Sequence, residues 1–315
     1  MIGVVGALLA LALGIAGVLH FMIRMPGTSH AGALPPLTGE ARALSLRLRL
    51  HVAALAAAER NTDLETAARY IEQAFRAQGA AVQVQQFPSG GRTVRNIEAG
   101  KGAIVVGAHY DTVPGSPGAD DNASGIAVLL ELAAHLKNES LPVRFVAFAN
   151  EEPPYSFGPE MGSWAWAKRA RERGESIRAM YSLEMLGYYR DTPGSQHYPA
   201  PLGLFYPDRA NFIAFVGDLG ARRLVRRSID AFRKHAQFPS EGVAAPGFIP
   251  GVTWSDHWSF RQHGYPAMMI TDTAFYRYPH YHLPSDTPDK LDYERMARVT
   301  LGLAAMLRAI SRQDE

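Results

Sequence analysis

Two continuously apolar segments with a helical pattern between them constrain the fold of this 315-residue chain more than any other feature. Residues 103–106 and 143–149 are apolar almost throughout, as strands buried on both faces of a sheet are. Between them, residues 123–137 repeat apolar side chains at helical spacing. A helix is the expected crossover between two parallel strands. The sequence therefore predicts an α/β fold with a parallel sheet at its centre.

Further segments extend this alternation over most of the chain. Residues 82–87 alternate apolar and polar side chains, which predicts a strand at the sheet edge. The other predicted helices cover residues 41–58, 64–78, 163–173, 219–235 and 293–310, and the other predicted strands cover residues 177–183, 212–216 and 267–270. This order predicts a three-layer α/β sandwich with a mostly parallel, mixed central sheet flanked by helices. Residues 187–207 and 238–251 are rich in Pro and Gly and too long for ordinary connections, so we expect them to wall a substrate pocket.

The first 23 residues contain no Asp, Glu, Lys or Arg. Since about 20 apolar helical residues cross a bilayer, we predict an N-terminal membrane anchor over residues 1–24. A cleaved signal peptide and a buried helix are the alternatives, although a signal peptide normally begins with basic residues. Residues 25–40 are rich in Pro and Gly and predict a linker, which leaves residues 41–315 as one large domain.

Composition narrows the possible partners and metal ligands. A formal charge of +2 gives no support to nucleic-acid binding, and the arginines of residues 222–227 fit one solvated face of a helix. The chain has no cysteine, which excludes disulfides and thiolate zinc sites. Any metal must therefore be held by His, Asp and Glu.

Acids and histidines follow the predicted strands. His109 and Asp111 come after the strand at residues 103–106, at a spacing that lets the carboxylate orient the imidazole toward a metal. Asp121 and Asn122 can cap the following helix, which would free Asp120 to bridge two cations. The alternative is that Asp120 belongs to the cap.

Adjacent acids occur again after the next strand. Glu151 and Glu152 are costly neighbours unless a cation or a shared proton compensates their charge. We expect Glu152 to bind metal and Glu151 to act as general base. Glu184 lies in an apolar setting and is a plausible third ligand. A later loop offers both His280 and His282, and spacing alone does not choose between them.

The ordered series His-x-Asp, Gly-Ala-Asp-Asp-Asn-Ala-Ser-Gly, Glu-Glu and Tyr-His-x-x-x-Asp-Thr resembles the dizinc aminopeptidase family of the aminopeptidase Y type. The resemblance covers roughly residues 64–310. Glutamate carboxypeptidases, glutaminyl cyclases and the transferrin-receptor ectodomain share this zinc exopeptidase fold. The resemblance implies His282 rather than His280 as a ligand, and it implies two zinc ions with Asp120 between them.

The resemblance also assigns the remaining site residues. The implied metal ligands are His109, Asp120, Glu152, Glu184 and His282. Tyr281 matches a position where a phenol stabilises the tetrahedral intermediate. Asp256 lies in a segment similar to one near the family's site, with ordinary hydrogen bonding as the alternative. Position 184 is commonly Asp in the best-known members, so the longer Glu184 side chain bears on the spacing and affinity of the second zinc ion.

The implied activity is hydrolysis of N-terminal bonds in a peptide or small amide, with Glu151 taking a proton from the attacking water. The alternatives are a single-zinc glutaminyl cyclase and a non-catalytic receptor-like module. Family similarity implies an extracytoplasmic catalytic domain, periplasmic or at the cell surface. The arginines that follow the apolar segment favour the opposite orientation, although long domains translocate regardless of nearby charge.

Overall fold

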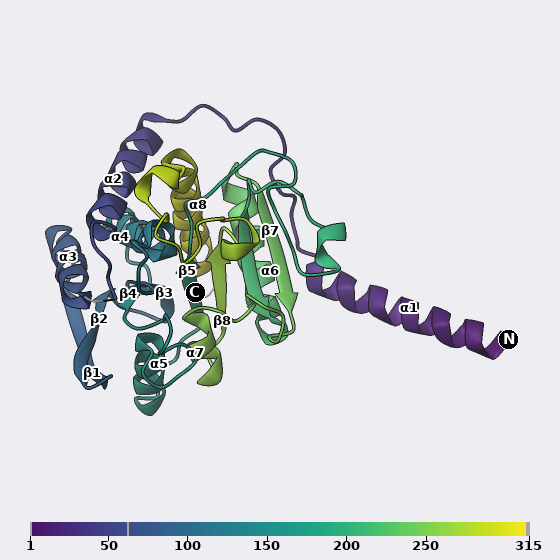
Figure 1. Ribbon diagram of the computed structural model, residues 1–315, viewed down its shortest axis with the longest axis horizontal. Helices are drawn as coiled ribbons and strands as arrows, with labels where there is room; N and C mark the ends of the chain where they lie inside the picture. The colour runs from purple at the N-terminus through teal and green to yellow at the C-terminus, as the bar shows by residue number, and fades with distance from the viewer. Residues whose placement is uncertain (1, 62, 313–315) are drawn as a thin grey trace.

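A mixed eight-stranded sheet runs through the centre of the computed structural model, which describes residues 2–61 and 63–312 (Figure 1). The strands lie in the order β1-β2-β4-β3-β5-β8-β6-β7. Their bounds are β1 Val82–Ser89, β2 Arg92–Gly100, β3 Ile104–His109, β4 Val143–Phe148, β5 Ala179–Glu184, β6 Ile213–Asp218, β7 Ser240–Ala245 and β8 Ala267–Thr271. Strands β4, β3, β5 and β8 are mutually parallel, whereas β6 and β7 are parallel to each other and run against β8.

Helices cover both faces of this sheet, which confirms the predicted three-layer α/β sandwich. Their bounds are α2 Gly39–Leu55, α3 Leu64–Ala77, α4 Gly125–Leu136, α5 Gly162–Glu172, α6 Arg222–His235, α7 His257–Gln262 and α8 Tyr293–Arg312. The larger core joins one sheet face to α2, α3, α4, α6 and α8, and a smaller core joins the other face to α5 and α7. Alternate residues of β3 divide between them: Val106 belongs to the larger core and Val105 to the smaller.

Local signals explain where several elements begin and end. Thr38 and Asp63 cap α2 and α3, since their side chains accept hydrogen bonds from the amides of Ala41 and Thr66. The structure adds strands β2 and β7 to the predicted set. Strand β7 lies inside residues 238–251, so the prediction of an irregular loop over that whole stretch was wrong.

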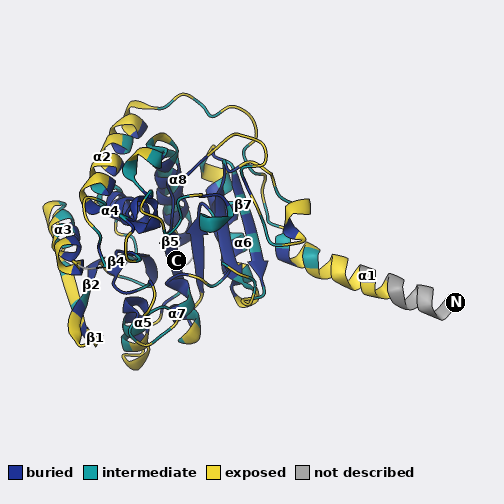
Figure 2. Cartoon of the chain, viewed as in Figure 1, coloured by how far each residue is buried: buried dark blue, intermediate teal, exposed yellow. Residues whose placement is uncertain are grey.

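Helix α1, Ile2–Ile23, projects from the body of the molecule (Figures 1 and 2). The chain after it, residues 24–38, has no regular structure but is hydrogen-bonded to the body of the molecule. Arg233 donates to the carbonyls of Pro26 and Gly27, and the Ser240 amide donates to Ser29 Oγ at 2.9 Å. These contacts fix the segment against α6 and β7.

Among the described helices, none is both long enough and apolar enough to cross a membrane. The predicted anchor over residues 1–24 falls partly outside the description, which omits residue 1 and the side chains of residues 2–9 and 12.

Candidate active site

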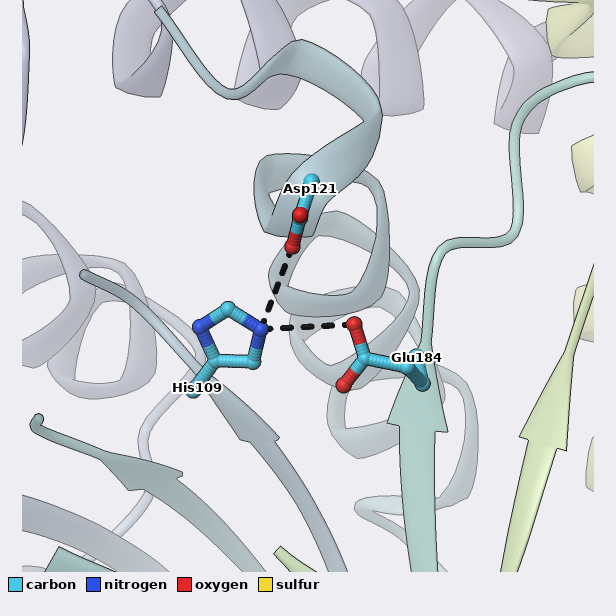
Figure 3. A group of neighbouring side chains, drawn as sticks. All are labelled: His109, Asp121 and Glu184. Atoms are coloured by element: carbon cyan, nitrogen blue, oxygen red, sulfur yellow. Dashed lines mark hydrogen bonds and ion pairs between the residues drawn. The ribbon is translucent and has the colours of Figure 1, made fainter. Parts of the chain in front are cut away.

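Three side chains from separate elements meet at one edge of the sheet (Figure 3). His109 ends β3, Glu184 ends β5, and Asp121 comes from the turn before α4. His109 Nε2 lies 3.3 Å from Asp121 Oδ1 and 3.4 Å from Glu184 Oε1. All three are buried, so they form a compact group of potential metal ligands.

A second group shares Asp121 with the first. His282 Nε2 lies 3.0 Å from Asp121 Oδ2 and 3.4 Å from Glu152 Oε1. The two carboxylate oxygens of Asp121 thus face different histidines. His280 points elsewhere, because its Nδ1 lies 2.9 Å from Ser285 Oγ. The geometry therefore favours His282 over His280 within this group.

The structure places Asp121, not Asp120, at the shared position of the two groups. Asp120 turns away, and its Oδ1 accepts a hydrogen bond from the Gly187 amide at 2.8 Å. Burial and the neighbouring Asp272 raise the pKa of Asp120 well above its usual range. The expectation that Asp120 bridges two cations disagrees with this geometry. The physical reason is the position of Asp286. Its carboxylate accepts hydrogen bonds from the backbone amides of both Asp120 and Asp121, and these bonds fix the backbone between the two residues.

Asp111 connects His109 to the pair of glutamates. Its Oδ1 lies 3.4 Å from His109 Nδ1, which leaves Nε2 directed toward Asp121 and Glu184. The same carboxylate accepts hydrogen bonds from the amides of Glu151 and Glu152, each at 3.0 Å. Asp111 is therefore placed to position other residues rather than to react with substrate.

Glu151 lies beside His109 and Glu152 and is only half-buried, whereas Glu152 is buried. Burial raises the pKa of Glu151 well above its usual range, His109 opposes this shift, and the charges of Glu152 and Glu184 add to it. A carboxylate with a raised pKa and an accessible surface has the properties of a general base.

Tyr281 and Asp256 complete the predicted set. The Tyr281 ring stacks on His282 with ring centroids 3.8 Å apart. Asp256 is buried, and burial raises its pKa to about 7 while the charge of His109 lowers it. Its neighbour Ser255 makes the direct contact with the site, since Ser255 Oγ donates to Glu184 Oε2 at 2.6 Å.

Arg60 is a supporting residue that the sequence patterns did not indicate. Its buried guanidinium donates to backbone carbonyls on both sides of the loop that precedes Asp120, including Tyr110 O at 2.8 Å and Gly118 O at 2.7 Å. Burial lowers the pKa of Arg60 to about 10, against the opposing charges of Asp286 and Asp121. No local motif marks it, because the hydrogen bonds of its guanidinium among the described residues go to backbone carbonyls.

The residues present fit a pair of divalent cations. In the second group, His282 Nε2 lies close to Asp121 Oδ2 and Glu152 Oε1, yet none of these three buried atoms makes a hydrogen bond. Buried polar groups are normally paired, so these atoms call for a ligand. Imidazole nitrogens with carboxylate oxygens are a donor set that zinc accepts.

An apolar pocket opens beside these groups, with Glu184 and Tyr281 in its wall. Tyr198, Leu202 and Tyr206 line it from the first Pro- and Gly-rich stretch, and Ile249 and Pro250 line it from the second. The prediction that both stretches wall a pocket is confirmed.

Comparison with known proteins identifies the family. The model of peptidase family M28 matches residues 91–307. The chain belongs to peptidase family M28. A protein named YfbL from Escherichia coli K12, described as uncharacterized, is 44% identical over 78% of this chain and 80% of its own length. A probable leucine aminopeptidase from Arthroderma otae is 29% identical over 80% of this chain and 68% of its own length.

Solved structures show the same fold at lower sequence identity. LapB from Legionella pneumophila has a TM-score of 0.67 at 21% identity, covering 90% of this chain and 78% of its own. A glutaminyl cyclase from Fimbriiglobus ruber has a TM-score of 0.62 at 22% identity, covering 90% and 99%. The predicted fold is confirmed, and the M28 family member is a hydrolase of the zinc exopeptidase type, as predicted.

Proposed function

We propose that this M28 peptidase is a zinc-dependent aminopeptidase that removes N-terminal residues from peptides. The observation that carries the proposal is the pair of ligand groups joined by Asp121, with Glu151 beside them. The curated relatives described as leucine aminopeptidases support this activity over that of a glutaminyl cyclase.

Two zinc ions would divide the site residues between them. His109 and Glu184 would hold one ion, Glu152 and His282 would hold the other, and Asp121 would contact both. When bound, the ions polarise the scissile carbonyl and acidify water at the site. The longer arm of Glu184 reaches the same group as His109 and Asp121, which supports its assignment as a ligand.

The protein's own residues then manage the proton and the developing charge. Glu151 accepts the proton of the attacking water and delivers it to the leaving amine. The Asp111 carboxylate accepts a hydrogen bond from the Glu151 backbone amide and keeps the His109 ring in place. The phenol of Tyr281, which lines the pocket next to Glu184, donates to the oxyanion of the tetrahedral intermediate. The charges of His109 and Glu184 both act on the buried Asp256 carboxylate, to which we assign a supporting role around these ligands.

Substitution of the general base tests this function. Glu151→Gln should reduce turnover of an aminoacyl anilide by roughly 10²- to 10⁴-fold with unchanged zinc content, because it removes proton transfer but no ligand. Glu172→Gln on the exposed face of α5 is the matched control and should leave turnover unchanged. Full activity in Glu151→Gln would exclude its role.

A substrate panel separates the aminopeptidase from its alternatives. Cleavage of free but not N-blocked peptides, abolished by a chelator, is expected. Ammonia release from N-terminal glutamine without peptide cleavage would instead identify a cyclase, and absence of both reactions would favour a receptor-like module.

We further propose that residues 1–24 attach the enzyme to a membrane, with residues 25–40 as the connection and residues 41–315 as an extracytoplasmic catalytic unit. Support comes from the exposed apolar side chains of α1, including Leu11, Leu13, Ile15 and Val18. Transfer of such side chains from water into lipid is favourable, because it removes their apolar surface from water. Protease treatment of spheroplasts tests the orientation. Digestion of the catalytic unit in intact spheroplasts is expected, and protection from the protease would indicate the opposite orientation.

A further inference from the structure

The floor of the apolar pocket is built from one row of the sheet. Glu184 pairs with Thr271, Thr271 pairs with Ala214, and Ala214 pairs with Glu241. Residues directly opposite one another point to the same face, and all four line the pocket. The row therefore starts at a candidate metal ligand and ends at a second carboxylate.

The space between the two carboxylates is apolar and open. Thr271 and Ala214 are small, and the adjacent row on the same face contributes Met269, Val216 and Val243. Three interstrand steps separate the Glu184 and Glu241 backbones by about 14 Å. A substrate side chain that enters from the Glu184 end must cross this apolar floor before it meets Glu241.

Glu241 has an ion pair with Arg233 and accepts a hydrogen bond from Ser29, which leaves acceptor positions free because an ionised carboxylate offers about four. Its nearest cation is Arg233, whose Nη2 lies 3.6 Å from Oε2, and its side chain is 21% exposed. Burial raises the pKa of Glu241, whereas the charge of Arg233 lowers it. Arg233 is already engaged by the carbonyls of Ser240 and Pro26. The Glu241 carboxylate can therefore accept a further donor.

The surroundings of Glu241 also suit a cation. Tyr198 and Tyr206 stack on each other with ring centroids 5.6 Å apart, and both line the pocket. The Tyr206 hydroxyl donates to the carbonyl of Gly242, the residue after Glu241, at 2.6 Å, which places this stacked pair beside the Glu241 end of the pocket. Aromatic faces attract ammonium and guanidinium groups, and an apolar channel favours the methylene stem of a long side chain.

We propose that Glu241 is a specificity-determining residue that binds the cationic end of an N-terminal lysine or arginine of the substrate. This inference rests on the proposed aminopeptidase activity and names its substrate class. An extended lysyl side chain spans about 6 Å through its single bonds of about 1.5 Å, and a hydrogen bond adds about 3 Å, so its ammonium group reaches Glu241 when the substrate Cα lies about one strand spacing from Glu184. Leucine is shorter, so it ends among the apolar residues and leaves the Glu241 carboxylate without a partner.

The first test compares two substrates on the native, zinc-loaded full chain. Lysyl and norleucyl anilides share the straight side chain, and only lysine carries the ammonium group. We expect kcat/KM for the lysyl substrate to be higher by roughly 10- to 100-fold, as a hydrogen bond to a charged group provides. Equal or lower kcat/KM for lysine would overturn the inference, while cleavage of either substrate preserves the proposed aminopeptidase.

The second test removes the charge with little change of shape. Glu241→Gln should bring the lysine-to-norleucine ratio close to one and leave kcat/KM for norleucine unchanged. Glu172→Gln, on the exposed face of α5, should retain the native ratio. A native ratio in Glu241→Gln would overturn the role of Glu241. Loss of cleavage of every substrate by the native enzyme would instead contradict the aminopeptidase itself.

Discussion

Adjacent aspartates have different tasks in this site. Asp121 faces both histidines, while Asp120 faces the Gly187 amide and the carboxyl group of Asp272. The sequence indicates that an acid at this turn would contact metal, but two neighbouring acids are equivalent until the backbone is fixed. That choice depends on Asp286, which lies 165 positions from Asp121 in the chain.

Zinc binding should separate the two aspartates. Asp121→Asn is expected to weaken zinc binding by more than the roughly 10- to 100-fold that loss of an outer partner costs. Asp120→Asn should retain zinc, because the raised pKa of Asp120 makes a neutral amide a close substitute. Titration with a competing chelator measures both variants. Equal zinc affinities in the two variants would contradict the assignment of Asp121.

His257 gives the fold a pH dependence of its own. Burial lowers its pKa to about 4, from 6.5, although the hydrogen bond with the Val252 carbonyl opposes the shift. Between pH 6.5 and pH 4, His257 is therefore protonated in the unfolded chain and neutral in the folded chain. Protonation of the unfolded chain does not reduce the free energy of unfolding above pH 6.5. It lowers this free energy by about 3 kcal/mol as the pH falls toward 4.

Urea denaturation of chelator-treated protein at pH 7.5 and 4.5 tests this. The loss of stability between the two pH values should be smaller by about 2.5 kcal/mol in His257→Gln than in the native protein. His235→Gln, on the exposed end of α6, should follow the native protein. An unchanged loss in His257→Gln would show that other groups set the acid limit.

At the scale of elements, strongly patterned segments were predictable and weakly patterned ones were not. Strands β3 and β4 and helix α4 follow from apolar runs and helical spacing. Strand β7 contains Ser, Gly and Ala at four of six positions, a composition with little strand preference. Strand β2 could have been predicted from the Gly90-Gly91 pair, which is typical of a two-residue hairpin turn. In the structure both glycines have positive φ and join β2 to β1.

The loop before α4 depends on Arg60 for its shape. Arg60→Ala would leave several buried carbonyls without donors and remove a cation from among four acids, so we expect a loss of at least about 2 kcal/mol in the free energy of unfolding. Arg76→Ala on the exposed face of α3 should cost less than about 1 kcal/mol. Chemical denaturation measures both. Equal losses would mean that the loop does not need the guanidinium.

At the scale of the whole molecule, metal and stability are linked. The site gathers buried carboxylates from β5 and from the loops after β3 and β4, and bound cations would reduce the repulsion between them. Chelation should therefore lower the Tm by at least about 5 °C, and added zinc should restore it. Differential scanning calorimetry provides the measurement, with Asp121→Asn as the control that should respond less to zinc. A Tm independent of chelator would exclude a structural contribution of the ions.

The reversed direction of β6 and β7 has a consequence for how this scaffold can diversify. Residues that would hold zinc lie at or after the carboxyl ends of β3, β4, β5 and β8, whereas Ala214 and Glu241 lie near the beginnings of β6 and β7. The residues for catalysis and those proposed to select the substrate side chain thus lie on strands that run in opposite directions. Different loops connect to the two sets. Insertions or substitutions before β6 and β7 can retune which residue is removed while the hydrolytic apparatus stays intact.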